Sequence, residues 1–385
     1  MAPRLRTQVF FITAARVVFN TAYRMVTPLL PAFRDGLGVT ERQLSISLAW
    51  RSGVGAVGPF LASIADSYGR KTAMLAGMFL FSAGISIVFF SPTLLGFTIA
   101  LALSTLGKFV FDPAMQAYLG DRVPYHRRGF VLGIVELGWS GAFLVGVPIV
   151  GVVIARAGWL APFPLLAVLG LVSGLTLYRS LPPDSPAERL PNQLLKTFRA
   201  ILSYPVALAG LAFTFMVALS NELVGLVIGL WLEDAFALQV ASLGAVAIVI
   251  GLAELGGEGL VSALVDRLGK RRAITYGLIG NALTALLLPI LGRTVPGALA
   301  ALFLFFLTFE FTFVSAIPLM TEVFPQKRAT FMALNFAAAS LGRGAAAWVG
   351  IPIFQIGFFA SALAAALVNG LSIFALRAVS IPADE

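Results

Sequence analysis

Ionisable side chains inside long apolar segments are the residues of this chain best suited to chemistry. A charge within a bilayer costs about 3 kcal/mol or more unless it is paired or faces a water-filled cavity, so each one is a candidate functional group. The first half of the chain contains Arg16, Arg24, Arg51, Lys108, Asp112 and Glu136, and the second half contains Glu222, Glu254, Glu258, Glu310 and Arg343. Four of the six residues in the first half are basic and four of the five in the second are acidic, which indicates a cavity with one cationic and one anionic wall.

Two pairs of these residues are spaced four positions apart and therefore share one helix face. Lys108 and Asp112 have opposite charges, so we expect a self-neutralising pair. Glu254 and Glu258 are both acidic, and two adjacent carboxylates in hydrocarbon cannot both ionise cheaply, so one is expected to hold a proton. A cationic substrate that displaced this proton would be transported in exchange for it.

Two other interpretations apply to the same charges. A static network of buried ion pairs would order the helices without taking part in function. Arg16 and Glu222 lie near the ends of their apolar segments, where the side chain reaches the interface as readily as a site. Glu310 and Arg343 lie deeper, and we expect them to pair with each other or with Lys108 and Asp112.

Several kinds of chemistry lack the residues they need. The chain has no cysteine and one histidine, so disulfides, thiolate nucleophiles and His/Cys metal centres are not expected. The Gly107-Lys108 and Gly269-Lys270 pairs lack the upstream glycine and the following Ser or Thr of a phosphate-binding loop. We therefore expect no cofactor, no metal and no enzymatic activity.

The elements that position these residues are long apolar helices. The chain is 59% hydrophobic and 12% charged, with a mean hydropathy of +0.93. Runs of about 20 apolar residues cross a bilayer as helices, whereas a β-barrel would show shorter segments of alternating hydrophobicity. We expect an all-α membrane protein whose twelve spans form two pseudo-symmetric six-helix bundles. The spans lie near 8–33, 41–66, 72–91, 94–119, 129–155, 159–179, 203–232, 240–265, 273–292, 296–320, 329–353 and 355–377.

Basic residues gather on one side of these spans. Eighteen of the 27 Lys and Arg residues fall in segments on the side of the N-terminus, and only Arg34, Arg42, Arg156 and Arg293 fall on the other side. The positive-inside rule places both termini in the cytoplasm, with the chain in the cytoplasmic (inner) membrane, and the basic charge needs no nucleic-acid partner. A Pro-rich polar connection predicts a bundle at 1–180, a cytoplasmic linker at 181–200 and a second bundle at 201–385.

An internal repeat relates the two halves. Asp66 and Asp266 end the second and eighth spans, 200 positions apart. Two further repeats follow in chain order: Asp121-x-x-Pro124-x-x-Arg127 with Glu322-x-x-Pro325-x-x-Arg328, and Gly146-x-Pro148 with Gly350-x-Pro352. Three repeats in the same order indicate two copies of one structural unit.

At these residues the chain resembles the major facilitator superfamily. The signature after the second span is Asp66, Gly69, Arg70 and Lys71, and its second copy is Asp266, Gly269, Lys270 and Arg271. Ala62 and Ser262 replace the usual first glycine of the signature. The resemblance covers the whole chain and implies a monomeric carrier that alternates access to a central site.

The resemblance also implies a cytoplasmic set of ion pairs that closes the inner side, here called the latch. In the first half it comprises Asp66, Gly69, Arg70, Asp121, Arg127 and Arg128, and in the second half Asp266, Gly269, Arg271, Glu322 and Arg328. The alternative is that these residues are solvated loop charges that set topology. That alternative is favoured for Lys71, Arg271 and Arg272, and the latch is favoured for Asp66 and Asp266.

The fifth span contains Gly141, Gly146, Pro148 and Gly151, which resemble part of the glycine/proline motif of the superfamily's antiporters. Ordinary helix packing with a proline kink explains them equally well. We predict proton-coupled export of amphiphilic or cationic small molecules, because the loop signature and the first span look most like drug exporters. The alternatives are a lipid or lysolipid flippase with a zwitterionic headgroup site, proton-coupled uptake of a small polar metabolite, and a sensor that binds ligand without transport.

Overall fold

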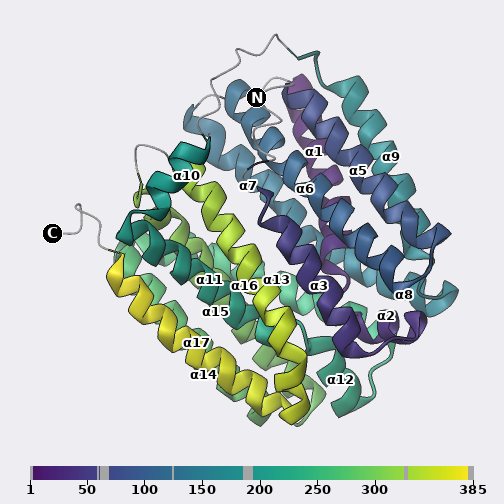
Figure 1. The fold of residues 1–385 in the computed structure, drawn as a ribbon, viewed down its shortest axis with the longest axis vertical. Helices are drawn as coiled ribbons and strands as arrows, with labels where there is room; N and C mark the ends of the chain where they lie inside the picture. The colour runs from purple at the N-terminus through teal and green to yellow at the C-terminus, as the bar shows by residue number, and fades with distance from the viewer. Residues whose placement is uncertain are drawn as a thin grey trace. The chain divides into compact units, whose positions relative to one another are not determined.

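The computed structural model describes residues 3–58, 60, 69–123, 125–184, 194–324 and 328–379. Within these ranges the regular secondary structure is helical. The first half contains α1 (Pro3–Arg24), α2 (Leu30–Leu37), α3 (Glu41–Gly55), α5 (Arg70–Phe90), α6 (Leu94–Arg122), α7 (Tyr125–Gly141), the π-helical turn η1 (Ala142–Gly146), α8 (Val147–Ala157) and α9 (Pro162–Ser180) (Figure 1). The second half contains α10 (Leu194–Leu202), α11 (Pro205–Gly225), α12 (Ile228–Phe236), α13 (Val240–Leu268), α14 (Lys270–Leu291), α15 (Val295–Thr321), α16 (Arg328–Ile356) and α17 (Phe358–Ala378).

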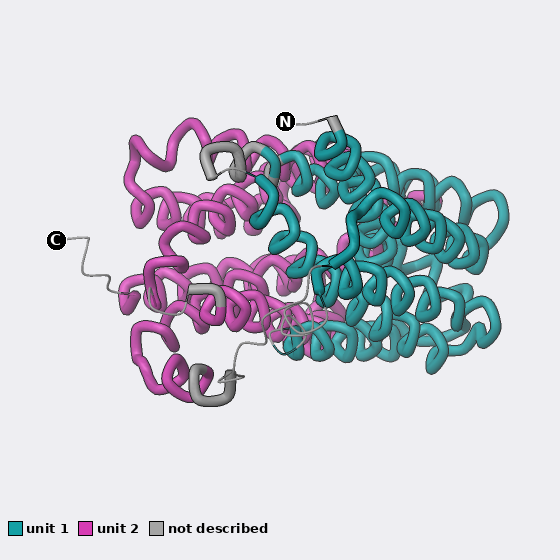
Figure 2. Tube along the Cα trace, turned by 90° about the horizontal axis from the view of Figure 1, so that it is seen from above, with its two compact units in different colours: residues 1–191, 240–247 teal, residues 192–239, 248–385 magenta. Residues whose placement is uncertain are grey.

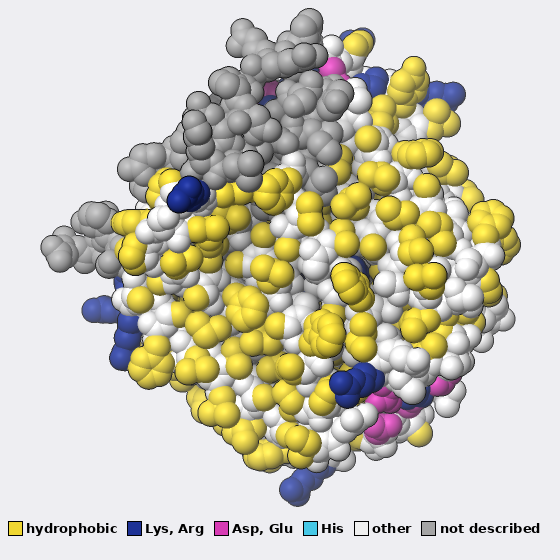
Figure 3. Space-filling view, viewed as in Figure 1, with side chains coloured by type: hydrophobic (Ala, Val, Ile, Leu, Met, Phe, Trp, Pro, Cys, Tyr) yellow, Lys and Arg dark blue, Asp and Glu magenta, His cyan; other side chains and the backbone are white. Residues whose placement is uncertain are grey.

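The protein is an all-α membrane protein. Ten helical segments of the described part are long and apolar enough to cross a membrane. The first two predicted spans complete a set of twelve: α1 and α2 occupy the first, and α3 occupies the described part of the second. Exposed apolar side chains such as Phe90, Leu95 and Ile356 suit a lipid environment, and hydrophobic atoms cover much of the face seen in Figure 3.

The first span is not the continuous helix that the sequence predicts over 8–33. Helix α1 ends at Arg24, residues 25–29 form turns, and α2 begins at Leu30. Pro28 and Pro31 cause the break, because proline has no N–H to donate and disfavours helical geometry in the residue before it. The seventh span is interrupted in the same way between α11 and α12, although no proline lies at that break.

Glycines let neighbouring helices approach closely in each half. A side chain at Gly77 of α5 would lie 2.6 Å from the carbonyl oxygen of Gly107 in α6, and one at Gly342 of α16 would lie 2.2 Å from that of Phe215 in α11. Helices in lipid associate through such close packing, since burial of apolar surface gives little driving force there. Helix α5 also packs against α9, and α11 packs against α17.

The chain divides into two compact units, coloured separately in Figure 2. Unit 1 comprises 1–191 with 240–247, and unit 2 comprises 192–239 with 248–385. The first turns of α13 therefore group with unit 1, and α10 occupies the end of the predicted linker. The division at 1–180, 181–200 and 201–385 stays a prediction.

Candidate functional site

Four charged residues of unit 1 meet between α1, α6 and α7, and we call them the Arg16 cluster: Arg16, Lys108, Asp112 and Glu136. Arg16 Nη1 lies 2.9 Å from Glu136 Oε1, and Lys108 Nζ lies 2.5 Å from Asp112 Oδ2. Arg16 Nε approaches Asp112 Oδ1 to 3.3 Å without hydrogen-bond geometry. The cluster thus joins three helices through two cations and two carboxylates.

The burial of Arg16 decides between the two positions that the sequence allows, because its side chain does not reach the interface. Arg16 is 4% exposed, and its guanidinium also donates to the backbone carbonyl of Val135 at 2.8 Å. Gly138 makes this contact possible, because a side chain there would lie 2.8 Å from Arg16 Cβ. The amide of Asn20 also donates to the carbonyl of Gly138 at 3.0 Å. Sequence reasoning missed Gly138, and the only signal was its place among the small residues of the fifth span.

Arg24 lies between two aromatic rings of the fifth span. Its Cζ is 4.1 Å from the ring centre of Trp139 and 3.5 Å from that of Phe143. It also donates to the carbonyl of Trp139 at 2.9 Å. Cation–π contacts of this kind favour a guanidinium when water is excluded.

Arg51 of α3 is held by Tyr23 of α1. Its Cζ lies 4.3 Å from the Tyr23 ring centre, and its Nη1 donates to the Tyr23 carbonyl at 2.7 Å. The side chain is almost fully buried, at 3% exposure, and its Nε lacks a hydrogen-bond acceptor. The Tyr23 ring in turn lies 6.2 Å from that of Trp139, so the arginines on both sides are connected through aromatic faces.

Two buried acidic residues of unit 2 lie where α13 packs on α15. Glu254 and Glu310 are 3% and 7% exposed. A side chain at Gly257 would lie 2.7 Å from Glu310 Cβ, which places the two helix backbones in close contact. Glu254 is three residues before Gly257 and shares its helix face, so both carboxylates lie near the same helix contact. Glu258 and Glu222 are half-buried.

Arg343 of α16 does not form the pair with Glu310 that the sequence suggests. It is half-buried, and in the described part of the chain no ion-pair partner faces it. The two residues lie on different helices, and sequence depth alone does not fix which faces meet.

The first copy of the predicted latch contains one ion pair whose two side chains are described. Arg70 Nε, at the start of α5, lies 3.6 Å from Asp121 Oδ2 near the end of α6. Gly69 has a φ of +98°, a conformation that L side chains rarely adopt, so only glycine serves well there. Asp66 lies outside the described residues, as do the side chains of Arg127, Arg128 and Arg328.

Asp184, which sequence reasoning missed, caps the N-terminus of α5. It accepts hydrogen bonds from the backbone N–H of Lys71 at 2.8 Å and from the N–H and hydroxyl of Thr72 at 2.9 and 2.8 Å. Partial burial raises the pKa of Asp184, but these hydrogen bonds and the Lys71 charge outweigh it and lower the pKa below its usual value. The sequence offered only an acidic residue after Pro182 and Pro183, with no indication of its partner.

The second copy of the latch differs from the first. Gly269 again has a positive φ, at +80°, but Asp266 is exposed and has no partner among the residues described. Arg271 donates to the carbonyls of Leu376 and Val379 near the end of α17, and Glu322 ends α15 half-buried.

Lys71 makes a contact similar to that of Arg271. Its Nζ donates to the Leu181 carbonyl at 2.8 Å, immediately after α9. The expectation that Lys71 and Arg271 are merely solvated is therefore wrong, because each bonds carbonyls at the end of the last helix of its half.

The glycine and proline residues of the fifth span surround the turn η1. Pro148 follows this turn, and its missing N–H favours a local widening of the helix. A side chain at Gly146 would overlap Thr21 Oγ1, and one at Gly141 would touch Val17. Gly151 lies against Gly244 of α13. Gly141 and Gly146 thus pack the fifth span on α1, where Trp139 and Phe143 contact Arg24, and Gly151 packs it on α13.

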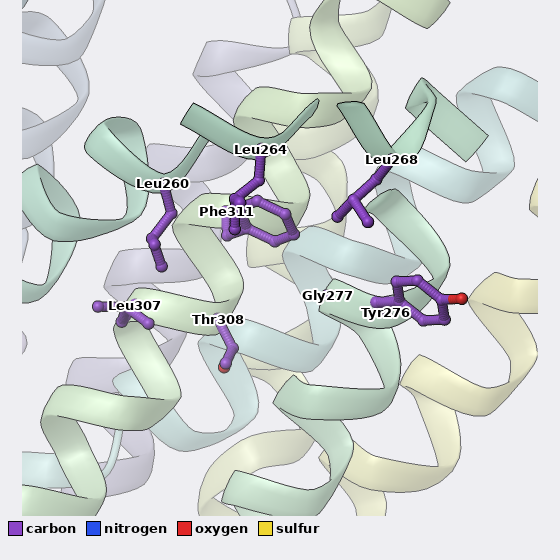
Figure 4. Close-up of a pocket in the computed structure, with 8 residues that line it drawn as sticks. All are labelled: Leu260, Leu264, Leu268, Tyr276, Gly277, Leu307, Thr308 and Phe311. Atoms are coloured by element: carbon purple, nitrogen blue, oxygen red, sulfur yellow. The ribbon is translucent and has the colours of Figure 1, made fainter. Parts of the chain in front are cut away.

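A separate groove of about 210 Å³ lies in unit 2 between α13, α14 and α15 (Figure 4). Leu260, Leu264, Leu268 and Phe311 provide much of its lining, with Tyr276 at one side. None of the predicted site residues lines it, so its apolar wall is a packing feature rather than the charged site.

Comparison with known proteins gives consistent matches along the chain. Residues 12–347 match the family model described as Major Facilitator Superfamily. The Chloramphenicol resistance protein of Streptomyces lividans is 25% identical over 97% of this chain and 95% of its own length. The Multidrug resistance protein MdtG of Serratia proteamaculans is 25% identical over 74% of this chain and 71% of its own. The crystal structure of D-xylose-proton symporter has a TM-score of 0.79 at 16% identity and covers 97% of both chains, which shows a shared fold.

Proposed function

Because the chain belongs to the major facilitator superfamily, we propose that it exports amphiphilic small molecules in exchange for protons, by alternating access to a central site. The family identifies the protein as a multi-pass membrane transporter of small molecules. We propose in addition the direction of transport, the coupling ion and the role of each charged residue.

The observation that carries the proposal is the burial of Glu254 and Glu310 at the α13–α15 contact. Ionisable side chains inside the membrane-spanning part are typical of proton and substrate pathways, so we take binding and release of a proton here to change the helix contact. Gly257 keeps the two helices close enough for this change to affect their packing. We assign proton coupling to these two residues, with Glu258 on the same helix as a second acceptor.

The Arg16 cluster supports a site in unit 1 that responds to substrate. Its ion pairs connect α1, α6 and α7, so a charged group that entered between them would compete with an existing partner. If the ion pairs differ between two conformations, the ligand binds one conformation more tightly than the other. A ligand shifts a conformational equilibrium only through such a difference in affinity.

Export is favoured by the names of two relatives, a chloramphenicol resistance protein and a multidrug resistance protein. Removal of a compound from the cytoplasm is the simplest way for a carrier to give resistance. In this proposal Arg70 and Asp121 form the described part of the latch, holding the inner ends of α5 and α6 together while the site is open outward. The protein works as a monomer in the cytoplasmic membrane, with both termini inside.

Inverted membrane vesicles test the proposal. An exporter that exchanges protons accumulates an amphiphilic dye when the vesicle interior is acidic, and nigericin, which collapses the pH gradient, abolishes accumulation. Accumulation only in right-side-out vesicles with an acidic exterior would establish uptake instead. Movement of dye or lysolipid that is indifferent to pH and sodium gradients would establish a facilitator or flippase.

A further inference from the structure

Arg51 is a permanently charged group buried in the membrane-spanning part of unit 1, and no acidic side chain of the described residues pairs with it. Among the residues that the structure describes, its hydrogen bond and its cation–π contact are both made with Tyr23, through the carbonyl and the ring. Arg16, a buried arginine of α1, contrasts with it, because carboxylates of Glu136 and Asp112 lie 2.9 and 3.3 Å from its guanidinium. Arginine keeps its charge in proteins, so an unpaired one at this position needs compensation from elsewhere.

The unused part of the Arg51 guanidinium has a defined geometry. Nη1 is occupied by the Tyr23 carbonyl at 2.7 Å, while Nε is buried without an acceptor. The Nε–H and the adjacent Nη2–H point in parallel, and this edge of a guanidinium matches the two oxygens of a carboxylate. The Tyr23 ring covers one face of the Arg51 guanidinium, with Cζ 4.3 Å from the ring centre. This contact orients the edge formed by Nε–H and Nη2–H.

We propose that Arg51 binds the carboxylate of an amphiphilic anion, and that the transported substrates of this protein include such anions. The inference rests on the proposed function only in taking the bound anion to be transported. The half-buried rings of Tyr23 and Trp139, 6.2 Å apart, offer aromatic surface beside the charge for the apolar body of the ligand. This assignment replaces the cationic substrate expected from the acidic second half with one of opposite charge.

Binding of three matched probes tests the proposal. 4-Hexylbenzoate, 4-hexylbenzamide and 4-hexylbenzylammonium share one apolar body and differ in headgroup. Titration into the purified full-length protein, followed by tryptophan fluorescence, gives the three dissociation constants. Hydrogen bonds to a charged group predict that the benzoate binds about 10- to 100-fold more tightly than the benzamide.

Variants of Arg51 separate the bidentate site from a general effect of charge. Arg51→Gln removes the preference for benzoate over benzamide, and Arg51→Lys retains only part of it, because an ammonium cannot bind both oxygens in one plane. Arg42→Gln, at an exposed position of the same helix, keeps the full preference. A variant counts as folded if it gives the same gel-filtration peak as the wild type and binds 4-hexylbenzamide with the same dissociation constant.

The outcomes distinguish this inference from the proposed function. Equal binding of benzoate and benzamide, no binding of either, or a preference that survives Arg51→Gln overturns the anion site. If the preference depends on Arg51 but no probe moves with a pH gradient in vesicles, the anion site stands and proton-coupled export fails. If the ammonium probe is exported and benzoate is neither bound nor exported, export stands and the anion site fails.

Discussion

The guanidinium of Arg16 in α1 lies 2.9 Å from a carboxylate oxygen of Glu136 in α7, 120 positions later in the chain. With Asp112 and Lys108 of α6, this pair connects the first, fourth and fifth spans through charge rather than through apolar packing.

Asp112→Asn should destabilise the protein more than Glu136→Gln. The Asp112 side chain is 21% exposed and faces both Lys108 and Arg16, whereas the Glu136 side chain is 44% exposed and faces Arg16 alone. Loss of one partner leaves a buried charge uncompensated, which costs about 3–5 kcal/mol when burial is complete and less when water reaches the pair. Thermal unfolding in detergent measures both, and equal shifts in melting temperature would remove Asp112 from the centre of the cluster.

Gly146→Ala should impair folding or transport, because its methyl group would overlap Thr21 Oγ1 and push the fifth span away from α1. Gly120→Ala is the matched control, since nothing lies within 4 Å of the added atom. Alanine in a helix interior is favoured over glycine by about 0.5–1 kcal/mol, so the control should be neutral or stabilising. Similar melting temperatures and transport rates for both variants would contradict the tight packing of the fifth span.

Asp184→Asn should lower stability near neutral pH and have less effect in acid. The pKa of Asp184 is lowered in the folded protein, so the native state favours the ionised form. Its contribution is fully present above the unfolded pKa, about 3.9, and is lost as pH falls through the lower folded pKa. The difference in melting temperature between wild type and variant should therefore shrink below that value. Asp266→Asn, at an exposed position without a described partner, is the control for the loss of a surface carboxylate.

Arg70→Asp and Asp121→Arg should each reduce transport while the melting temperature changes little. Exposed ion pairs contribute only about 0–1 kcal/mol to stability, and the Asp121 side chain is 59% exposed. If the pair controls which side is open, the double variant with exchanged charges should recover much of the transport rate. Failure of the exchange to improve on either single variant would count against the latch.

Much of the fold follows from patterns that are local in sequence. Apolar runs separated by charged turns predict the spans, and the spacing of Lys108 and Asp112 predicts a pair because the two share one helix face. The positions at which helices break are harder to predict from the sequence. Pro28 and Pro31 indicate that the first span is irregular, but they do not indicate that α1 ends at Arg24. Whether a proline kinks, widens or ends a helix depends on what packs beside it.

The site was harder to predict because its contacts are distant in sequence. The place of Arg16 in its span fits the interface as well as a site, and its burial is explained by contacts on other helices, including Glu136, Asp112 and Gly138. Asp184 caps Lys71 and Thr72 from more than 100 positions away. Depth along a helix can be counted from the sequence, whereas the rotation of each helix against its neighbours is set by packing.

Proton movement during transport tests the central claim most directly. A pH-sensitive dye trapped in proteoliposomes reports protons that cross as substrate is added, and substrate movement is followed in parallel. The wild type should move both, whereas Glu254→Gln and Glu310→Gln should each abolish substrate-driven proton flux while substrate still equilibrates. Substrate-driven proton flux that persists in both variants, or is absent from the wild type, would contradict proton coupling through the α13–α15 contact.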